Sequence, residues 1–351
     1  MDKPKKILIV QTAFLGDLIL TTPLIRETKK IFPLSDLYVV ALPQYSDVLK
    51  NNPYVCEIIE FDKRKSKLRE LIKTAKKLKK LQIDLAISPH RSATTAALLK
   101  LSKVKRIIGF KGFFSFLYDD AVSVPEEGLT IEKNLKLLSI FSDKDFDIKT
   151  EIYPTSKDYE KAREWLLSFG INFNYPIVGL APGSVWETKK WKKEYYAEVA
   201  RNLKSEKYNV VFIGDKKEAL LCEEIISLAQ AEMPNLAGKT NLLESAALVS
   251  HFDLLICNDS GAMHIANAMS CDVFAFFGPT VKAFGFFPYR ENDKVFEVNL
   301  KCRPCSSHGG KECPLKHHNC MKLIYPNIVL EEIYKKFSEF KESKAKRLIF
   351  P

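Results

Sequence analysis

The 351-residue sequence predicts an α/β protein with doubly wound parallel sheets, divided between two domains. Short apolar runs of strand length alternate with helical patterns along most of the chain. The alternation stops in a polar stretch at 143–175 and then starts again. The chain is also too long for one ordinary hydrophobic core, whereas its length suits two. We therefore expect an N-terminal domain at 1–155, a second domain at 174–325 and a terminal helical segment at 326–351.

The first half contains six apolar runs that we interpret as strands of one sheet. They are Lys6–Gln11, Leu37–Leu42, Glu57–Phe61, Leu85–Pro89, Arg106–Phe110 and Ala121–Val124. Helical patterns lie between them at 17–31, 44–51, 66–81, 92–101 and 130–141.

The second half repeats this plan after a helical pattern at Ser156–Phe169. The strands are expected at Ile177–Ala181, Asn209–Ile213, Phe252–Cys257, Val273–Phe277 and Lys294–Val298. Helices are expected at Lys193–Lys204, Glu218–Gln230, Leu242–Ser250 and His264–Met269, and an amphipathic pattern follows at Ile328–Phe340. The economical architecture is two facing Rossmann-like domains with a ligand cleft between them, and the terminal helix could pack back across the hinge.

The composition indicates a soluble protein with a basic first half. The sequence has no apolar run long enough to span a membrane and no export signal, so we expect a cytoplasmic protein. Residues 1–150 contain 27 lysines and arginines against 18 acidic residues, which accounts for most of the net charge of +11. Such a surface favours an anionic partner, although the lysines of 73–80 alone are better explained by a solvated helix.

The most informative stretch is Cys257–His264, which joins an apolar strand to a helical pattern. Gly261 lets backbone N–H groups approach a ligand, and the start of a helix attracts negative charge. This arrangement suits a phosphate-bearing ligand at the carboxyl end of an open sheet. The ordinary alternative is that Asp259 or Ser260 only caps the helix.

Three further turns follow strands of the same predicted sheet. Pro182-Gly183-Ser184 comes shortly before Lys189 and Lys190, Gly214 comes shortly before Glu218, and Gly278-Pro279-Thr280 follows the next strand. Hydroxyls, backbone N–H groups and lysines are suitable phosphate ligands. Because these turns lie at one sheet edge, we expect them to converge on one crevice.

The turn after the first strand of the chain runs to Gly16-Asp17 and lacks the glycine pattern of a dinucleotide site. Asp17 lies in the first turn of a helix, where its charge would also favour the helix dipole. The position is compatible with a carboxylate exposed at the sheet edge.

Four cysteines gather near the C-terminus, at Cys302, Cys305, Cys313 and Cys320. A cluster that opens with C-x-x-C fits a structural zinc site, and reduced thiols without a metal are the alternative. The other cysteines, Cys56, Cys222, Cys257 and Cys271, lie in apolar patterns and are expected in the core.

Taken together, these motifs resemble the lipopolysaccharide heptosyltransferases, which transfer heptose from ADP-heptose with inversion and have the GT-B fold. The resemblance rests on Gly16-Asp17, Pro182-Gly183-Ser184 with Lys189, Asn258–His264 and Phe277–Thr280. It implies that Asp17 is the general base for the acceptor hydroxyl and that no metal takes part in the chemistry. The donor-binding residues that it implies are Ser184, Lys189, Lys190, Glu218, Asp259, Ser260, Gly261 and His264.

The resemblance also implies a phosphorylated lipid A-core acceptor at the cytoplasmic face of the inner membrane. Arg91, Lys63 and Arg64 are the acceptor-binding candidates, and the basic residues nearby could bind the anionic inner-membrane surface. The aromatic run 113–117 either dips into the membrane interface or packs in the core. The cysteine-bearing end favours the enzyme that adds the second heptose over the one that adds the first.

Three other readings compete with this one. A metal-containing nucleic-acid-binding protein is disfavoured because the basic residues and the cysteines lie in different halves. A non-catalytic relative is disfavoured because Asp17, Lys189 and Asp259 occur together. A transferase of the same fold that uses another nucleotide sugar is the serious alternative.

Overall fold

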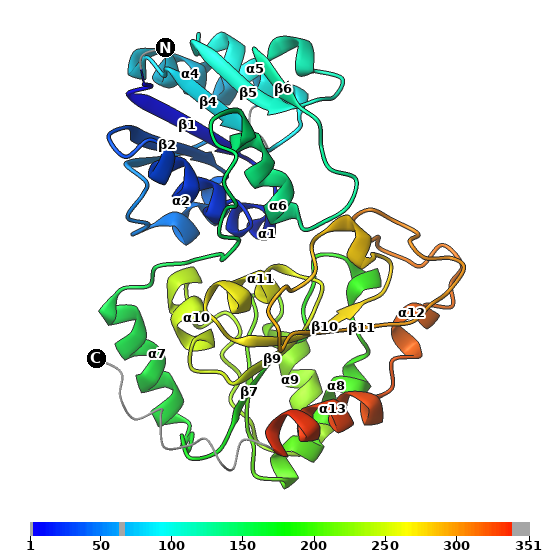
Figure 1. Cartoon of the computed structure of the whole chain (residues 1–351). Coiled ribbons are helices and arrows are strands. Elements are labelled where there is room, and N and C mark those ends of the chain that lie inside the picture. The colour runs from blue at the N-terminus through cyan, green and yellow to red at the C-terminus, as the bar shows by residue number, and fades with distance from the viewer. Residues whose placement is uncertain (1–2, 63–66, 339–351) are drawn as a thin grey trace. The chain divides into compact units, whose positions relative to one another are not determined.

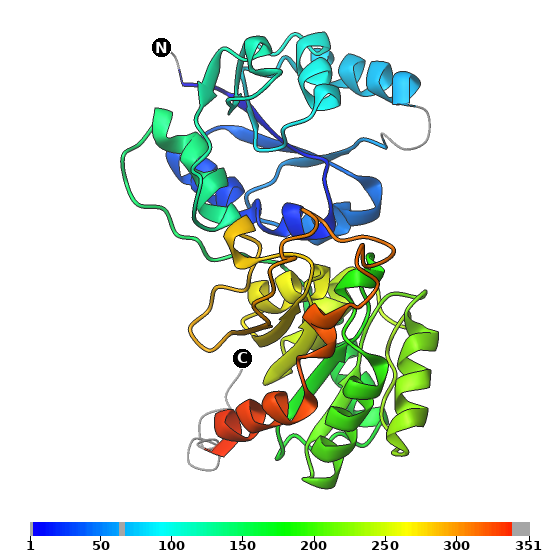
Figure 2. The same ribbon diagram turned by 90° about the vertical axis from the view of Figure 1, so that its right-hand side faces the viewer.

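The computed structural model of the protein describes residues 3–62 and 67–338, which form two compact units (Figure 1). The first unit comprises Met1–Lys157 and Lys282–Phe286, and the second comprises Asp158–Val281 and Phe287–Pro351. Each unit contains one parallel sheet with helices on both faces (Figure 2). The predicted α/β class with two doubly wound domains is confirmed.

The first unit has a six-stranded sheet in the order β3-β2-β1-β4-β5-β6. Its strands are β1 (Lys6–Gln11), β2 (Asp36–Ala41), β3 (Glu57–Glu60), β4 (Leu85–Ser88), β5 (Arg106–Phe110) and β6 (Asp120–Val122). Its α-helices are α1 (Leu15–Ile19), α2 (Thr22–Ile31), α3 (Pro43–Ser46), α4 (Lys67–Leu81), α5 (Ala93–Leu101) and α6 (Thr130–Leu135). The strand order reverses between β1 and β4, which is where open sheets of this kind bind ligands.

The second unit has a five-stranded sheet in the order β11-β10-β9-β7-β8. Its strands are β7 (Ile177–Ala181), β8 (Asn209–Phe212), β9 (Leu254–Asn258), β10 (Asp272–Phe277) and β11 (Lys294–Glu297). Its helices are α8 (Lys193–Ser205), α9 (Ala219–Ala229), α10 (Leu242–Val249), α11 (Gly261–Ala268), α12 (Asn319–Lys322) and α13 (Pro326–Ser338), and α7 (Ser156–Ser168) spans the unit boundary. Here the order reverses between β7 and β9.

The core of the second unit fixes the ends of its strands. Trp191 stacks on Phe276 of β10 with ring centroids 4.1 Å apart, and its Nε1 donates to the Ile324 carbonyl at 2.9 Å. Ile333 and Phe337 of α13 belong to the same buried cluster, so the terminal helix packs on α8 within this unit.

Several sequence predictions of helices are wrong in their limits. The helix expected at 17–31 is broken, because Pro23 in the first turn of α2 has no N–H to continue the ladder. The Thr22 hydroxyl donates to the Ile19 carbonyl at 2.8 Å in its place. The patterns at 44–51 and 130–141 end as 3₁₀ turns, at Asp47–Leu49 and Lys136–Ile140.

Two local expectations fail for other reasons. The helix expected to begin at His264 begins at Gly261, so the predicted turn residues form its first turn. Cys56 is exposed beside the start of β3, whereas Cys222, Cys257 and Cys271 are buried as predicted. α12 was not predicted, because four residues give no periodic signal.

The first unit includes a short piece of distant sequence. The N–H of Thr130 in α6 donates to the Gly285 carbonyl at 2.8 Å. Gly285 has a φ of +86°, and a Cβ there would lie 2.5 Å from the Gly128 carbonyl oxygen. The chain therefore leaves the first unit, enters the second, returns for residues 282–286 and leaves again.

Candidate functional site

The turn between β9 and α11 is fixed by Asn258, whose side chain is fully buried. Its amide donates to the carbonyls of Pro182 at 2.8 Å and Gly183 at 3.2 Å. Its Oδ1 accepts from the Trp191 N–H at 2.9 Å. Asn258 thus joins the turns after β7 and β9, the two strands on either side of the reversal in strand order.

Asp259 lies at the end of this turn and is the centre of a buried polar cluster. Its Oδ2 is 2.6 Å from Lys189 Nζ and accepts from the Thr280 hydroxyl at 2.7 Å. The side chains of Lys189 and Asp259 are only 13% and 8% exposed. The structure therefore brings together the turns after β7, β9 and β10, as the sequence predicts for these residues.

His264 lies one turn into α11 and is buried beside the same ion pair. Burial lowers the pKa of its imidazole to about 4; the charge of Asp259 opposes this shift and that of Lys189 adds to it. The ring is therefore neutral at pH 7 and can exchange hydrogen bonds without adding a positive charge.

The start of α11 is not explained by ordinary helix capping. Ser260 occupies the N-cap position, but its side chain makes no capping hydrogen bond. Asp259 is engaged by Lys189 and Thr280 instead. The first N–H groups of α11, which begins at Gly261, therefore remain suited to an anion.

Glu218 is the N-cap residue of α9, which follows β8, and its carboxylate lies against Gly183 in the turn after β7. A Cβ added to Gly183 would be 1.8 Å from Glu218 Oε1, so only glycine permits this approach. Burial raises the pKa of the Glu218 carboxyl, while a hydrogen bond from the Asp215 N–H and the charge of Lys190 oppose the rise. Lys190 also pairs with Glu187, and the Ser184 hydroxyl accepts from the Trp186 N–H at 3.4 Å.

The corresponding end of the first sheet carries Asp17 in α1, which directly follows β1. Asp17 Oδ2 accepts from the Phe14 N–H at 3.1 Å, which fixes the start of this short helix. The Thr12 hydroxyl and His90 Nδ1 are 3.0 Å apart and join the ends of β1 and β4. Arg91 follows His90 and is exposed. Asp17 and Arg91 therefore both lie at the reversal in strand order of the first sheet.

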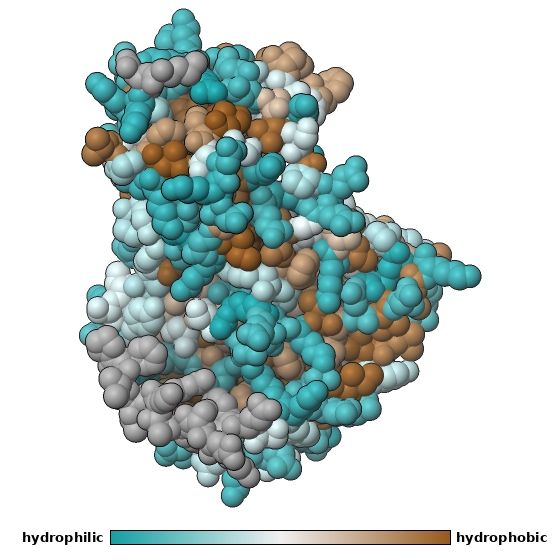
Figure 3. All heavy atoms as spheres, viewed as in Figure 1, coloured by the Kyte–Doolittle hydropathy of each residue, from teal (hydrophilic) through white to brown (hydrophobic). Residues whose placement is uncertain are grey.

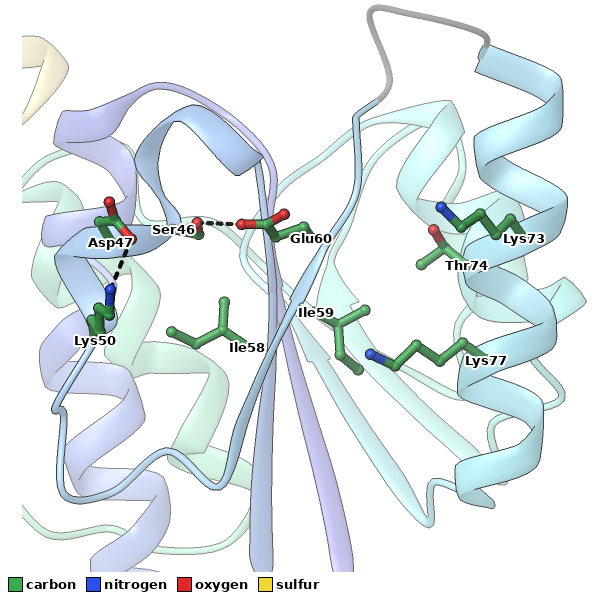
Figure 4. A pocket seen from close by; sticks show the side chains of 9 residues that line it. All are labelled: Ser46, Asp47, Lys50, Ile58, Ile59, Glu60, Lys73, Thr74 and Lys77. Carbon is green, nitrogen blue, oxygen red and sulfur yellow. Dashed lines mark hydrogen bonds and ion pairs between the residues drawn. The ribbon is translucent and has the colours of Figure 1, made fainter.

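A cavity of about 460 Å³ lies between α4, β3 and the α3 region of the first unit (Figure 4). Lys73 and Lys77 extend from α4 toward β3, where Lys77 lies beside Ile59, and a Ser46–Glu60 hydrogen bond of 2.8 Å lies opposite Lys73. The adjoining outer face of α4 forms a shallow hollow of about 490 Å³, which we call the α4 basic face; it consists of Arg69, Ile72, Lys73, Lys76, Lys77 and Lys80.

Only part of the charge on the α4 basic face is neutralised. Lys77 pairs with Glu57 at 2.6 Å and Lys73 approaches Glu70 at 3.8 Å. Among the described residues, Arg69, Lys76 and Lys80 have no acidic partner. The predicted acceptor residues Lys63 and Arg64 lie outside the described part of the chain.

The four C-terminal cysteines lie near one another: burial raises the pKa of the Cys320 thiol to about 11, the nearby thiols of Cys305, Cys313 and Cys302 add to the rise, and the charge of Arg303 opposes it. Within residues 3–62 and 67–338, however, no three His, Cys, Asp or Glu side chains are placed to hold one metal ion. The thiols as arranged do not form a ligand set, and the zinc site stays a prediction.

Sequence reasoning did not assign roles to Asn258, Thr280 and Arg303. Asn258 and Thr280 belong to motifs that follow strands, so the sequence predicts where they lie at the sheet edge but not which groups they bind. Arg303 was hidden inside the C-x-x-C motif, and its partners are distant backbone carbonyls that no local pattern reveals.

Comparison with known proteins adds an independent result. Residues 71–317 match glycosyltransferase family 9 (heptosyltransferase). Lipooligosaccharide heptosyltransferase 2 of Campylobacter jejuni is 29% identical over 343 residues, which cover 94% of this chain and 98% of the relative.

Two solved structures have the same fold. The glycosyl transferase family 9 protein from Veillonella parvula has a TM-score of 0.86 at 21% identity, covering 95% of this chain and 98% of its own. E. coli ADP-heptose lps heptosyltransferase II has a TM-score of 0.78 at 23% identity, covering 96% and 99%.

Proposed function

The chain belongs to glycosyltransferase family 9, the heptosyltransferases, and we propose that it transfers L-glycero-D-manno-heptose from ADP-heptose to the inner core of lipopolysaccharide. We further propose that it adds the second heptose, with inversion. The names of the C. jejuni relative and of the E. coli structure support the position and the donor. The observation that carries the proposal is the Lys189–Asp259–Thr280 cluster at the reversal point of the second sheet.

The cluster suits a sugar diphosphate. Cleavage of the glycosidic bond builds negative charge on the departing diphosphate, and fixed donors stabilise that charge where it develops. Lys189 supplies a cation and the first turn of α11 supplies backbone N–H groups. Both side-chain contacts of Asp259 among the described residues use Oδ2, so Oδ1 is available to a heptose hydroxyl.

Ser184, Lys190, Ser260, Gly261 and His264 complete the proposed diphosphate environment. In this proposal Glu218, at the N-cap of α9 after β8, accepts hydrogen bonds from the ribose hydroxyls of the nucleotide. A neutral His264 leaves Lys189 as the cation nearest the buried aspartate.

We propose Asp17 as the general base. In an inverting transfer the acceptor hydroxyl attacks the anomeric carbon on the face opposite the leaving group, so one carboxylate suffices to remove the proton. The carboxylate is oriented by its hydrogen bond from the Phe14 N–H. The charge on the leaving diphosphate is balanced by protein groups, so the proposed chemistry uses no metal.

The first unit supplies the proposed acceptor surface. A phosphorylated lipid A-core acceptor and an anionic inner-membrane surface are both negatively charged, and Arg91 and the α4 basic face carry the complementary positive charge. No helix in the described part of the chain is long and apolar enough to cross a membrane. Hydrophilic residues dominate the face seen in Figure 3, with apolar residues among them, and Phe113 and Phe116 are 87% and 76% exposed. We propose peripheral binding at the cytoplasmic face.

The donor assignment is tested by isothermal titration of ADP, UDP and GDP against the wild type and Lys189→Ala. We expect preferential ADP binding that the substitution weakens by about tenfold or more, as for a charged hydrogen bond. ADP-heptose turnover then follows, with the anomeric configuration of the product read by NMR. A preference for UDP or GDP would contradict the donor while leaving the fold.

The membrane assignment is tested by sedimentation with vesicles of anionic or zwitterionic phospholipid. Arg69, Lys76 and Lys80 of the α4 basic face are replaced together by glutamine, and the control replaces Lys204, Lys207 and Lys335 of the second unit. Each basic residue near an anionic surface contributes about 1 kcal/mol. Binding should therefore fall strongly only for the α4 variant; equal loss in both variants would contradict the proposal.

A further inference from the structure

The segment between β11 and α12, which carries Cys302, Cys305 and Cys313, also contacts the candidate donor site. The Arg303 guanidinium is only 5% exposed and donates to four backbone carbonyls. Three of them lie at the end of β10 and in the turn that follows: Nε donates to the Gly278 carbonyl, and Nη2 donates to those of Phe277 at 3.1 Å and Thr280 at 2.8 Å. The fourth is the Val298 carbonyl, and Glu297 pairs with the same guanidinium at 2.8 Å.

The turn that Arg303 holds is the one that presents Thr280 to Asp259. Successive carbonyls directed at one buried point repel one another unless a cation with several donors lies between them. Arginine can satisfy all of them because its planar fork has five N–H groups, whereas lysine has three on one atom. Arg303 therefore fixes the Thr280 hydroxyl, and through it the carboxylate that pairs with Lys189.

The same segment forms hydrogen bonds to the turn that carries Lys189. The N–H of Thr188 donates to the Gly310 carbonyl at 3.1 Å, and the Gly310 N–H donates back to the Thr188 hydroxyl at 2.8 Å. His318 Nε2 lies 2.8 Å from the Thr188 carbonyl. Gly309, with a φ of +100°, packs so closely that a Cβ would be 2.8 Å from Trp186 Cβ.

We propose that residues 303–318 form a positioning element for the diphosphate site, in which Arg303 sets Asp259 through Thr280, and Gly310 with His318 sets Lys189 through Thr188. The inference rests on the proposed function, because the pair it positions is the proposed donor site. Arg303 and Thr188 are positioning residues and do not touch the substrate. They determine the relative placement of the two charged groups, to which catalysis is sensitive at the scale of 1 Å.

The test compares Arg303→Lys and Thr188→Val with Arg201→Lys. Arg201 is a matched control, because its guanidinium also donates to backbone carbonyls of the second unit, those of Ala229 at 3.0 Å and Leu228 at 2.8 Å. For each protein, ADP affinity, kcat, KM and the melting temperature are measured, together with amide exchange of peptides covering 186–190 and 277–281.

We expect Arg303→Lys to lower kcat/KM by about tenfold to a hundredfold and to speed exchange at 277–281. Thr188→Val should speed exchange at 186–190 and weaken ADP binding by about tenfold, as for the loss of a buried hydrogen bond with its partners left unpaired. Arg201→Lys should change neither. The proposal is overturned if both site variants retain wild-type exchange and ADP affinity, or if all three variants lose activity only in proportion to their melting temperature.

The design separates this proposal from the donor assignment. A wild-type protein that binds no ADP overturns the donor assignment, whereas exchange at the two turns in the variants still decides whether residues 303–318 hold them. Normal ADP binding with unchanged exchange overturns the positioning role alone.

Discussion

At the reversal point of the second sheet, buried side chains tie together the turns after β7, β9 and β10, whereas at that of the first sheet a few hydrogen bonds join turns that stay accessible. Asn258 alone connects the turns after β7 and β9 through three backbone groups. In the first unit the main link of this kind is the bond between Thr12 and His90. Proteins use rigid sites to stabilise charge that develops in a fixed place and adaptable surfaces to receive large partners. The difference agrees with the proposed roles, in which the second unit binds the donor and the first unit binds the acceptor.

The largest expected effect is on turnover, and it distinguishes the proposed catalytic role of the first unit from the proposed donor binding of the second. Asp17→Asn should lower kcat by about 10²–10⁴-fold, because a general base contributes that much, and should leave ADP affinity unchanged. The asparagine carbonyl can still accept from the Phe14 N–H, so α1 keeps its start. Turnover of ADP-heptose and titration of ADP measure the two quantities. A variant that turns over at the wild-type rate would remove Asp17 from the mechanism.

The second prediction tests the difference in rigidity. Asn258→Ala should lower the free energy of unfolding by about 3 kcal/mol, because the buried Trp191 N–H and the Pro182 carbonyl lose their partner. Thr12→Val should cost about 1 kcal/mol, since His90 Nδ1 keeps the Thr95 hydroxyl at 3.1 Å. Denaturant unfolding measures both, and equal losses would show that the two ends are held alike.

The third prediction uses pH. The pKa of His264 is about 4 in the folded protein, below its unfolded value of 6.5. Between these values the unfolded state binds a proton that the folded state does not, so stability falls as pH drops below 6.5. From pH 7 to pH 5 the His264 contribution should fall by about 2 kcal/mol. His264→Gln should remove that share of the pH dependence, and parallel unfolding curves for both proteins would contradict it.

The strands were predictable because buried parallel strands appear as short apolar runs closed by turn residues. Ile177–Ala181 and Arg106–Phe110 match their predicted limits. The break at Pro23 was missed because the amphipathic pattern continues through it. Asp259 and Lys189 were found because charged residues followed strands or glycine turns, whereas Arg303 acts on carbonyls that are adjacent only in the folded chain.

The return of residues 282–286 to the first unit has a consequence for how such a chain can be divided. A recombination point or a gene fragment ending at 157 would omit the Gly285 carbonyl that accepts from the Thr130 N–H. The excised second portion would keep those five residues without the surface they belong to. The chain therefore cannot be divided at a single point into two exchangeable units. Chimaeras that exchange the first unit between relatives need to exchange residues 282–286 together with the N-terminal portion.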